Sequence, residues 1–525
     1  MAKVKTSVIF KTYSQQQNCL LPPNLDELVG AHHLVRVVNE VVEGMDISEV
    51  INLYKGGGTS AYHPRMLLKV LLYAYSMKIY TSRKIAQALR QDIHFMWLSA
   101  MNYPDFRTVN NFRSGKAKDV IEVLFKEVLE FLLEHGYIKM ENYFCDGSTL
   151  RADANQHKMI WKKNAERYKQ QAGAKCQELF KQIDELNDQE EAQYGKEDLE
   201  EKGDASMITK EAIEEKVLDL NKKIQEAADK KAKRKATVIR KKLVEAKDRI
   251  DRYDKQIQTA GQRSGYSKTD KDATAMMMKN KVEVLPAYNI LAGSENQFIT
   301  GVSVHQNTND GVCFKDHLEQ LIDQQPFTPD RIIADSIFGT ERNYELLEEK
   351  EVENYLKFPS YHAEQKKSYE QNIFFKENFG YDPLTDTYSC PNGRLLIYQK
   401  SFINTHKRTG YESVIKEYEC ENCAGCPLYE KCCKSSQGAN RTIQVNEKLE
   451  NYKQQARENL GTEKGTQLKK QRSIEIESCF GDIKHNMGFR RFHLRGVDKV
   501  KTEFAIVAMA HNIRKVHLQR VQKAA

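Results

Sequence analysis

YFCDGSTL, residues 143–150, and RIIADSIFG, residues 331–339, decide the fold that this sequence predicts. Each is a short apolar run, typical of a buried strand, with a single aspartate at or near its end. Burial is unfavourable for a lone carboxylate unless it is paired, hydrogen-bonded or bound to a metal ion. The two runs therefore predict neighbouring strands that bring Asp146 and Asp335 to one site.

The segments around these runs predict a mixed sheet. Strands are expected at 287–294, 298–305 and 353–358, and helices at 311–325 and 340–350. Strands and helices that succeed one another in this order argue for an α/β fold, in which helices cover both faces of the sheet.

The first 140 residues predict an all-helical domain. The run 66–80 is apolar nearly all round, as expected of a buried helix, and Thr81 or Ser82 is positioned to cap the next helix. A turn follows, and then a further helix that carries Arg107 and Arg113. Two short helices with basic residues on the second are similar to a helix-turn-helix. We expect DNA contact here, with an ordinary helical bundle as the alternative.

The composition is that of a globular chain with a strongly polar portion. Its 525 residues are 40% hydrophobic and 29% charged, with a net charge of +8, which permits a polyanionic partner. The sequence has no signal-peptide pattern and no run of about eighteen apolar residues. We therefore expect a cytoplasmic protein that does not contact a membrane.

Two segments interrupt the expected sheet. Residues 154–265 are rich in Lys, Glu, Gln and Asp, and their sparse apolar residues are often three or four apart. This spacing predicts a helical hairpin or coiled coil, with a break at Gly203 and Asp204. The second arm is basic around 230–242, which fits a solvated helix and a nucleic-acid contact equally well. Residues 359–466 are expected to be irregular and turn-rich.

Six cysteines cluster in the second insert, at residue 390 and in CENCAGCPLYEKCC, residues 420–433. In a cytosolic chain such clustering favours metal or free thiols over disulfides. Thiolates at CxxC spacing suit tetrahedral zinc, so we expect Zn²⁺ to hold this insert together, with free thiols as the alternative. The expected ligands are Cys420, Cys423, Cys426 and Cys432, with Cys390 and Cys433 in reserve.

A helix expected at 468–487 supplies a third acid. Glu477 and Lys484 lie seven residues apart, so they lie nearly on one line along the helix. The carboxylates of Asp146, Asp335 and Glu477 suit two Mg²⁺ or Mn²⁺ ions, which take oxygen ligands and leave positions for phosphate and water. The basic residues that follow are expected to hold DNA phosphates. They are Lys484, Arg490, Arg491 and Arg495.

The ordered set of motifs resembles bacterial insertion-sequence transposases with a DDE catalytic domain on a ribonuclease H-like fold. The stretches that carry the resemblance are FCDGSTLRADAN, SGYSKTDKDAT, YNILAGSENQFITGVSVHQNTND, RIIADSIFGTERNYELL and RSIEIESCFGDIKHNMGFRRFHLRG, with YHPRMLLKVLLYAYSMKIYTSRKIAQAL and PDFRTVNNFR in the N-terminal region. Each stretch alone is weakly specific. The ordered set covers most of the chain and is highly specific.

The resemblance implies roles for the three acids. Asp146 matches the first catalytic aspartate and Asp335 the second. Glu477 matches the glutamate of the late helix, because six residues separate it from the next lysine, as in the family. Arg472 departs from the family pattern, since four residues rather than three separate it from Glu477. This departure keeps Glu475 open as the alternative third acid.

By the same resemblance, the chain is expected to be a DNA transposase. It would bind the inverted-repeat ends of its element, cleave a phosphodiester to free a 3′-hydroxyl, and use that hydroxyl to attack target DNA. A dimer or higher multimer on paired DNA ends in the bacterial nucleoid is implied as well. The alternatives are a nuclease of the same fold and a catalytically silent DNA-binding protein derived from a transposase.

Four regions are expected from these assignments. They are an N-terminal DNA-binding domain (1–140), a discontinuous ribonuclease H-like catalytic domain (141–153, 266–358 and 467–525), the charged helical insert (154–265) and the cysteine-rich insert (359–466).

Overall fold

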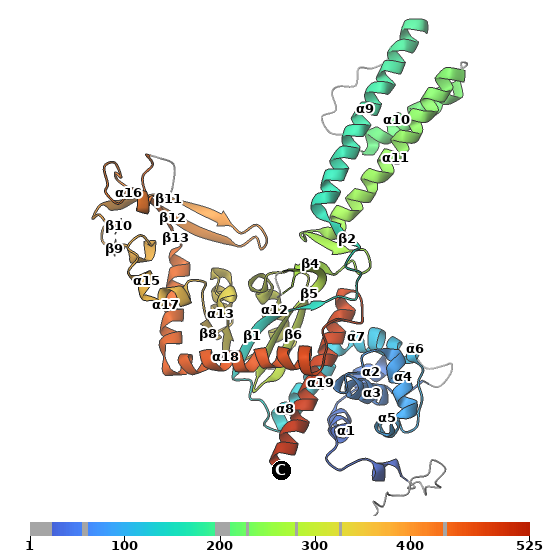
Figure 1. Ribbon diagram of the computed structural model, residues 1–525, viewed down its shortest axis with the longest axis vertical. Coiled ribbons are helices and arrows are strands. Elements are labelled where there is room, and N and C mark those ends of the chain that lie inside the picture. Colours follow the sequence, from blue (N-terminus) through green and yellow to red (C-terminus); the bar gives the residue numbers. More distant parts are fainter. Residues whose placement is uncertain are drawn as a thin grey trace, which may run out of the picture.

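Figure 1 shows a central sheet with helices around it, from which two further units extend. A long helical hairpin projects from the body, and a second, smaller sheet lies on the other side. The structure is a computed structural model and describes residues 24–54, 61–194, 210–226, 230–278, 282–324, 328–433 and 438–524. Within these residues no helix has the length and apolar character needed to cross a membrane.

The central sheet is mixed, as expected. Its strands are β1 (Asn142–Arg151), β2 (Met159–Trp161), β3 (Gly265–Ser267), β4 (Thr274–Met277), β5 (Val284–Glu295), β6 (Phe298–His305), β7 (Arg331–Ala334) and β8 (Glu353–Leu356). They lie in the order β2-β3-β4-β5-β1-β7-β8, and β6 also pairs with β5. Strands β1, β7 and β8 are parallel, whereas β5 is antiparallel to both β1 and β6.

Helices from the second half of the chain pack on this sheet. They are α12 (Asp310–Gln324), α13 (Glu341–Glu349), α17 (Glu447–Gly461), α18 (Glu463–Gly481) and α19 (Val497–Ala524). Helix α18 crosses the sheet and contacts β1, β5 and β7. A π-helical turn, Asp482–Asn486, extends it. Helix α19 begins where Asp272 accepts a hydrogen bond from the Val497 amide (3.0 Å).

The N-terminal region is helical, as expected. Its helices are α1 (Leu34–Gly44), α2 (Ser48–Asn52), α3 (Pro64–Ser76), α4 (Ser82–Gln91), α5 (Ile93–Leu98), α6 (Phe106–Asn111), α7 (Ala117–Asp119) and α8 (Ile121–Glu134). Thr81 caps α4, which confirms one of the two expected caps. Asp92 caps α5 through the His94 amide (2.8 Å), so the segment 81–98 forms two helices rather than one. Helices α4 and α6 pack together.

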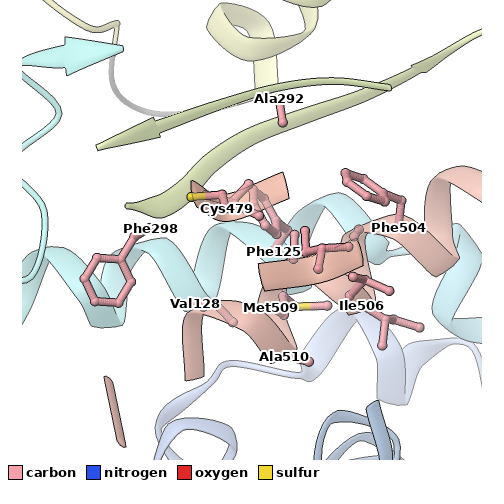
Figure 2. Close-up of a cluster of buried hydrophobic side chains, with 14 of the residues drawn as sticks. Phe125, Val128, Ala292, Phe298, Cys479, Phe504, Ile506, Met509 and Ala510 are labelled. Atoms are coloured by element: carbon pink, nitrogen blue, oxygen red, sulfur yellow. The ribbon is translucent and has the colours of Figure 1, made fainter. Parts of the chain in front are cut away.

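One hydrophobic core joins the N-terminal helices to the sheet. Figure 2 shows Phe125 of α8 among Ala292 of β5, Cys479 of α18, and Phe504 and Met509 of α19. All five side chains are buried. The N-terminal region and the sheet therefore share their core, and α19 supplies the apolar surface that both use.

A buried ion pair reinforces this junction. The Glu503 side chain in α19 is fully buried, and its carboxylate accepts hydrogen bonds from the His493 amide (2.8 Å), the Leu494 amide (2.9 Å) and the Tyr75 hydroxyl (2.9 Å). Arg113, only 3% exposed, lies 3.8 Å from the same carboxylate and also donates to the Tyr75 hydroxyl (2.7 Å). The expectation that Arg113 contacts DNA is therefore corrected, because its guanidinium is enclosed in the core.

A second buried pair ties α19 to the π-helical turn. His511 Nδ1 lies 2.8 Å from Asp482 Oδ2, and Arg514 lies 3.9 Å from Asp482 Oδ1. Burial opposes protonation of His511, yet hydrogen bonds with Asp482 and Cys479 raise its pKa to about 9. Burial alone would raise the pKa of Asp482, but the hydrogen bond from His511 lowers it to about 2. The pair is therefore ionised at neutral pH.

The charged insert is helical, as expected, but the structure describes three helices rather than two. They are α9 (Lys162–Tyr194), α10 (Lys210–Glu226) and α11 (Lys230–Ala260). A narrow apolar seam that includes Cys176, Leu179 and Leu243 holds them together. The expected break at Gly203 and Asp204 lies outside the described residues.

The cysteine-rich insert is more regular than expected. It contains a second sheet in the order β13-β12-β11-β10-β9. The strands are β9 (Gly380–Asp382), β10 (Thr387–Ser389), β11 (Leu395–Thr405), β12 (Glu412–Cys420) and β13 (Thr442–Val445), with the short helices α14 (Tyr361–Glu364), α15 (Lys367–Glu370) and α16 (Tyr429–Cys432) nearby. The expectation of an irregular segment at 359–466 was wrong. Strand β11 is largely exposed and lacks the apolar alternation that marks a strand in sequence, whereas most residues of β12 are partly buried.

Arg113→Ala is expected to lower the free energy of unfolding by about 3 kcal/mol or more, because it leaves the Glu503 carboxylate buried without its cation. Calorimetric unfolding of the full chain measures the effect. Arg107→Ala is the matched control: Arg107 is exposed, so its loss is expected to change stability by no more than about 0.5 kcal/mol. Equal stability of the two variants would contradict the role given to the buried pair.

His511→Gln is expected to destabilise the chain in a pH-dependent manner. Folding raises the pKa of His511 from 6.5 to about 9, so the stabilisation is complete below pH 6.5 and is lost as the pH rises through 9. At about 1.4 kcal/mol per pKa unit it amounts to roughly 3 kcal/mol. Thermal midpoints of variant and wild type should differ clearly at pH 6.5 and converge near pH 10. The exposed His485→Gln serves as control, and a pH-independent difference for His511→Gln would argue against the ion pair.

Candidate active site

Strands β1 and β7 bring the two aspartates side by side. They are parallel neighbours in which Cys145 lies opposite Ala334, so Asp146 and Asp335 are the next residues on adjacent strands. The pairing places the two carbons that carry these side chains about one strand spacing apart, roughly 5 Å. Asp146 is half-buried, and the side chain of Asp335 is 42% exposed. Two acids that the sequence separates by almost two hundred residues thus share one edge of the site.

Arg472 connects the second aspartate with the glutamate of α18. Its Nη2 atom lies 3.3 Å from Glu477 Oε1 and 3.7 Å from Asp335 Oδ2. The Arg472 side chain is 10% exposed, and its Nε atom is buried with no hydrogen-bond partner among the described residues. The guanidinium offsets the repulsion between the two carboxylates.

Glu475, the alternative third acid, lies elsewhere. Its carboxylate accepts a hydrogen bond from the Gln297 amide (2.5 Å) in the turn between β5 and β6. Burial raises the pKa of Glu475, which suits a structural carboxylate. Glu477 is half-exposed and faces Asp335 through Arg472. The geometry therefore favours Glu477 over Glu475 as the partner of the two aspartates.

Lys357 is a site residue that sequence reasoning missed. It follows β8, is 8% exposed, and its Nζ lies 3.9 Å from Asp335 Oδ1. Burial lowers the pKa of Lys357, whereas the charge of Asp335 acts in the opposite direction. The position of Lys357 at the end of an expected strand was a usable signal. The carboxyl ends of neighbouring parallel strands meet at one edge of a sheet, so a residue at this position can lie near Asp335.

A further acid lies against β1 beside Asp146. The Asp310 carboxylate accepts a hydrogen bond from Asn289 Nδ2 (2.6 Å), and a Cβ atom at Gly147 would lie only 2.3 Å from Asp310 Cγ. Only glycine at position 147 permits this approach. Burial raises the pKa of Cys145, and the charges of Asp146 and Asp310 raise it further, which shows that both carboxylates act on this part of β1.

The Lys484 side chain packs against strand β1, the strand that carries Asp146. The π-helical turn directs its Nζ to Ser148 Oγ (2.5 Å) and to the Thr149 carbonyl oxygen (3.1 Å). Single π turns inside helices are frequent at functional sites. The turn changes the simple seven-residue relation between Glu477 and Lys484, but it still positions the lysine two residues beyond Asp146 along β1.

Exposed arginines gather where β1 ends. Arg491 Nη2 lies 3.4 Å from Asp153 Oδ1, and Arg495 Nε lies 2.9 Å from Asp153 Oδ2. Arg490 donates to the Lys484 carbonyl oxygen (3.1 Å). The side chains of Arg491 and Arg495 remain 56% and 53% exposed, so most of this positive surface is open to a ligand. Arg107 is also exposed, but on α6.

The oxygen donors of the site fit a divalent cation in chemistry. Asp146, Asp335 and Glu477 are carboxylates with solvent access, and Mg²⁺ prefers oxygen ligands. In the described part of the chain, no group of three or more His, Cys, Asp or Glu side chains is arranged closely enough to hold an ion. At this site the Arg472 guanidinium lies within 4 Å of both Glu477 and Asp335.

The six clustered cysteines line one cavity at the end of the small sheet. All are free thiols. Burial raises the pKa of Cys420 to about 12, and burial raises that of Cys432 as well. Cys423 Sγ accepts a hydrogen bond from the Arg441 amide (3.3 Å), whereas Cys433 Sγ contacts the Ala439 carbonyl oxygen (3.4 Å).

Comparison with protein families gives two matches. Residues 389–517 match a transposase DDE domain, and residues 23–115 match a transposase domain (DUF772). The first match includes the cysteines, Glu477 and Lys484, but neither Asp146 nor Asp335. A search of curated proteins and a search of solved structures found no match. Both family matches agree with the resemblance carried by the sequence motifs, and they identify the chain as a relative of insertion-sequence transposases with a DDE domain.

Proposed function

We propose that this chain is an active DNA transposase that cleaves phosphodiesters at the ends of its element and joins the freed 3′-hydroxyls to target DNA. The observation that carries the proposal is that Asp146 and Asp335 lie on adjacent strands and that Arg472 links Asp335 to Glu477, next to an exposed basic surface. The residues proposed for catalysis and those proposed for phosphate binding would thus lie next to each other.

The strand arrangement supports a ribonuclease H-like catalytic domain. The five strands β6-β5-β1-β7-β8 begin with two antiparallel pairings and end with two parallel ones. In this fold class the acids come from the first strand, from the end of the next parallel strand and from a late helix. β1, β7 and α18 supply the three acids of this chain in that order.

The chain's own residues have distinct tasks in the proposed reaction. Asp146, Asp335 and Glu477 would hold Mg²⁺ or Mn²⁺, and two such ions supply activation of the attacking oxygen and stabilisation of the leaving oxygen in an in-line displacement. Arg472 orients Glu477 and Asp335, and its unpartnered Nε suits an anionic oxygen. Lys484 positions the strand bearing Asp146 and adds positive charge for the scissile phosphate.

The proposed catalytic set is tested by Mg²⁺- or Mn²⁺-dependent cleavage of duplex DNA that carries the element's ends. Asp146→Asn, Asp335→Asn and Glu477→Gln are each expected to slow cleavage at least about a hundredfold, because each removes a carboxylate that would stabilise developing charge. Glu475→Gln is the matched control: it keeps an oxygen acceptor for the Gln297 amide and should leave cleavage unchanged. Full activity in the three variants, or loss in the control alone, would overturn the assignment.

Two other functions give different results in the same experiment. A nuclease of the same fold cleaves the ends but forms no joined product when target plasmid is added. A catalytically silent DNA-binding protein binds the ends and cleaves nothing under any metal condition. Strand joining by wild type, lost in Glu477→Gln, is the result expected of a transposase. Assembly as a dimer on paired ends, in the bacterial nucleoid, belongs to the same proposal.

We also propose that the cysteine cavity binds one Zn²⁺ through Cys420, Cys423, Cys426 and Cys432. The support is that all four line the same cavity and that the Arg441 amide donates to Cys423 Sγ, a hydrogen bond that favours the thiolate form. The described cysteines are not already grouped closely enough to hold an ion, so zinc binding requires the four thiols to draw together. The small sheet has a core of only a few buried side chains, so a metal would add needed stability. Cys390 and Cys433 line the cavity too and are the alternative ligands.

Elemental analysis of purified protein is expected to find one zinc per chain. Cys426→Ser should abolish stoichiometric zinc and lower the unfolding temperature, because three thiolates bind the ion less tightly. Cys433→Ser is the control, since this thiol already contacts the Ala439 carbonyl, and it should retain the metal. Wild-type protein without stoichiometric zinc would reject the proposed site, and the free-thiol interpretation would hold instead.

A further inference from the structure

The projecting helical hairpin carries a row of basic side chains outside the catalytic site. Lys235, Lys242 and Arg249 of α11 recur at seven-residue steps, so they lie on one side of the helix about 10.5 Å apart. All three are exposed. They lie beside the apolar seam that contains Ile239, and none of them enters it. The row is therefore available to a ligand outside the hairpin.

Two residues of this row line a groove between helices α9 and α11. Lys242 and Arg249 line a groove of about 230 Å³ between α9 and α11, to which α9 contributes Lys175. Glu245 is the single acid among the nine lining residues. The other lining residues are Tyr168, Gln171, Ala172, Ala246 and Tyr253. We call Lys175, Lys235, Lys242 and Arg249 the basic stripe.

Two of the four acids of α11 are engaged elsewhere. Asp251 and Asp254 each pair at 2.7 Å with a lysine of α10 or α9. Lys247, on another side of α11, pairs with Glu214 of α10. In the described part of the hairpin, no member of the basic stripe forms an ion pair. Asp251, Asp254 and Glu214 thus hold the hairpin together, and among the groove-lining residues Glu245 is the one acid that offsets the charge of the stripe.

We propose that the basic stripe binds the phosphate backbone of duplex DNA beyond the catalytic site. The inference rests on the proposed function for the presence of DNA and adds a second contact region to it. Regularly spaced cations on a rigid rod suit a polyanion with a regular phosphate spacing. Tyr168 and Tyr253 pack against each other, 5.8 Å between ring centroids, rather than offering open stacking platforms for single-stranded bases.

The dimensions of the hairpin agree with this partner. Helix α11 has 31 residues and a length of about 46 Å, which exceeds one turn of B-DNA, about 34–36 Å. The first and last stripe residues of α11, Lys235 and Arg249, lie about 21 Å apart along the axis. Contacts of this kind carry no base information, so the stripe adds affinity and positions the duplex without selecting its sequence.

The test compares two variants of the full-length chain, in each of which four basic residues are replaced by glutamine. The stripe variant changes Lys175, Lys235, Lys242 and Arg249. The control variant changes Lys163, Lys181, Lys222 and Lys255, which are exposed on the three helices of the same insert and do not line the groove. Both variants lose the same net charge, so a general electrostatic effect weakens both equally. Circular dichroism melting verifies that the helices remain folded.

Binding to a 50-base-pair duplex is measured by fluorescence anisotropy without divalent metal, at several KCl concentrations. Four lost phosphate contacts are expected to reduce the slope of log Kd against log[KCl] by about 3.6 in the stripe variant and to weaken binding most at low salt. The control should keep the wild-type slope. Binding to a duplex of unrelated sequence should fall by the same factor, because the contacts are made to phosphates.

The outcomes separate this inference from the proposed function. If both variants bind like wild type, or if both weaken equally, the stripe has no direct DNA contact, whereas wild-type cleavage of element ends would still support the transposase. If wild type itself neither binds nor cleaves DNA, the proposed function fails first. Selective weakening of a single-stranded or RNA ligand, with duplex binding unchanged, would also overturn the inference.

Discussion

The burial of Glu503 in α19 is the constraint on which the rest of the fold depends. A fully buried carboxylate is costly unless donors surround it, and here they come from the N-terminal helices and from the segment after α18. Arg113 and Tyr75 therefore cannot separate from the catalytic half of the chain without leaving a charge unpaired. The region that matches a transposase N-terminal domain is thus built into the same core as the sheet.

Charges of opposite sign also compensate each other at the candidate active site. Arg472 lies 3.3 Å from Glu477 and 3.7 Å from Asp335, and Lys357 lies 3.9 Å from Asp335, so both cations offset the charge of these two carboxylates. The two cations are largely buried, whereas the side chains of Asp335 and Glu477 are 42% and 52% exposed. Beyond β1, the exposed side chains of Arg491 and Arg495 add positive charge to the surface.

Sequence reasoning predicted the parts of the structure whose signal is local. The apolar runs that end near Asp146 and Asp335 can be recognised in the sequence. The predicted bounds of the strands and helices of the central sheet agree with the observed bounds within a few residues. The small sheet was missed because its longest strand, β11, is largely exposed and carries no apolar alternation. Arg113 was misassigned because exposure depends on a partner, Glu503, that lies almost four hundred residues away. The position of Lys357 beside Asp335 likewise needed the pairing of β7 with β8.

The place of α19 in the chain has a consequence for synthesis. Residues 497–524 provide buried surface to α1, α3 and α8, yet they leave the ribosome after every other described element. Until then the N-terminal helices expose apolar side chains that only α19 covers, and contacts between such distant segments form slowly. The nascent chain therefore completes this core only after residues 497–524 have been synthesised, so the N-terminal helices and the sheet cannot reach their final packing before that point.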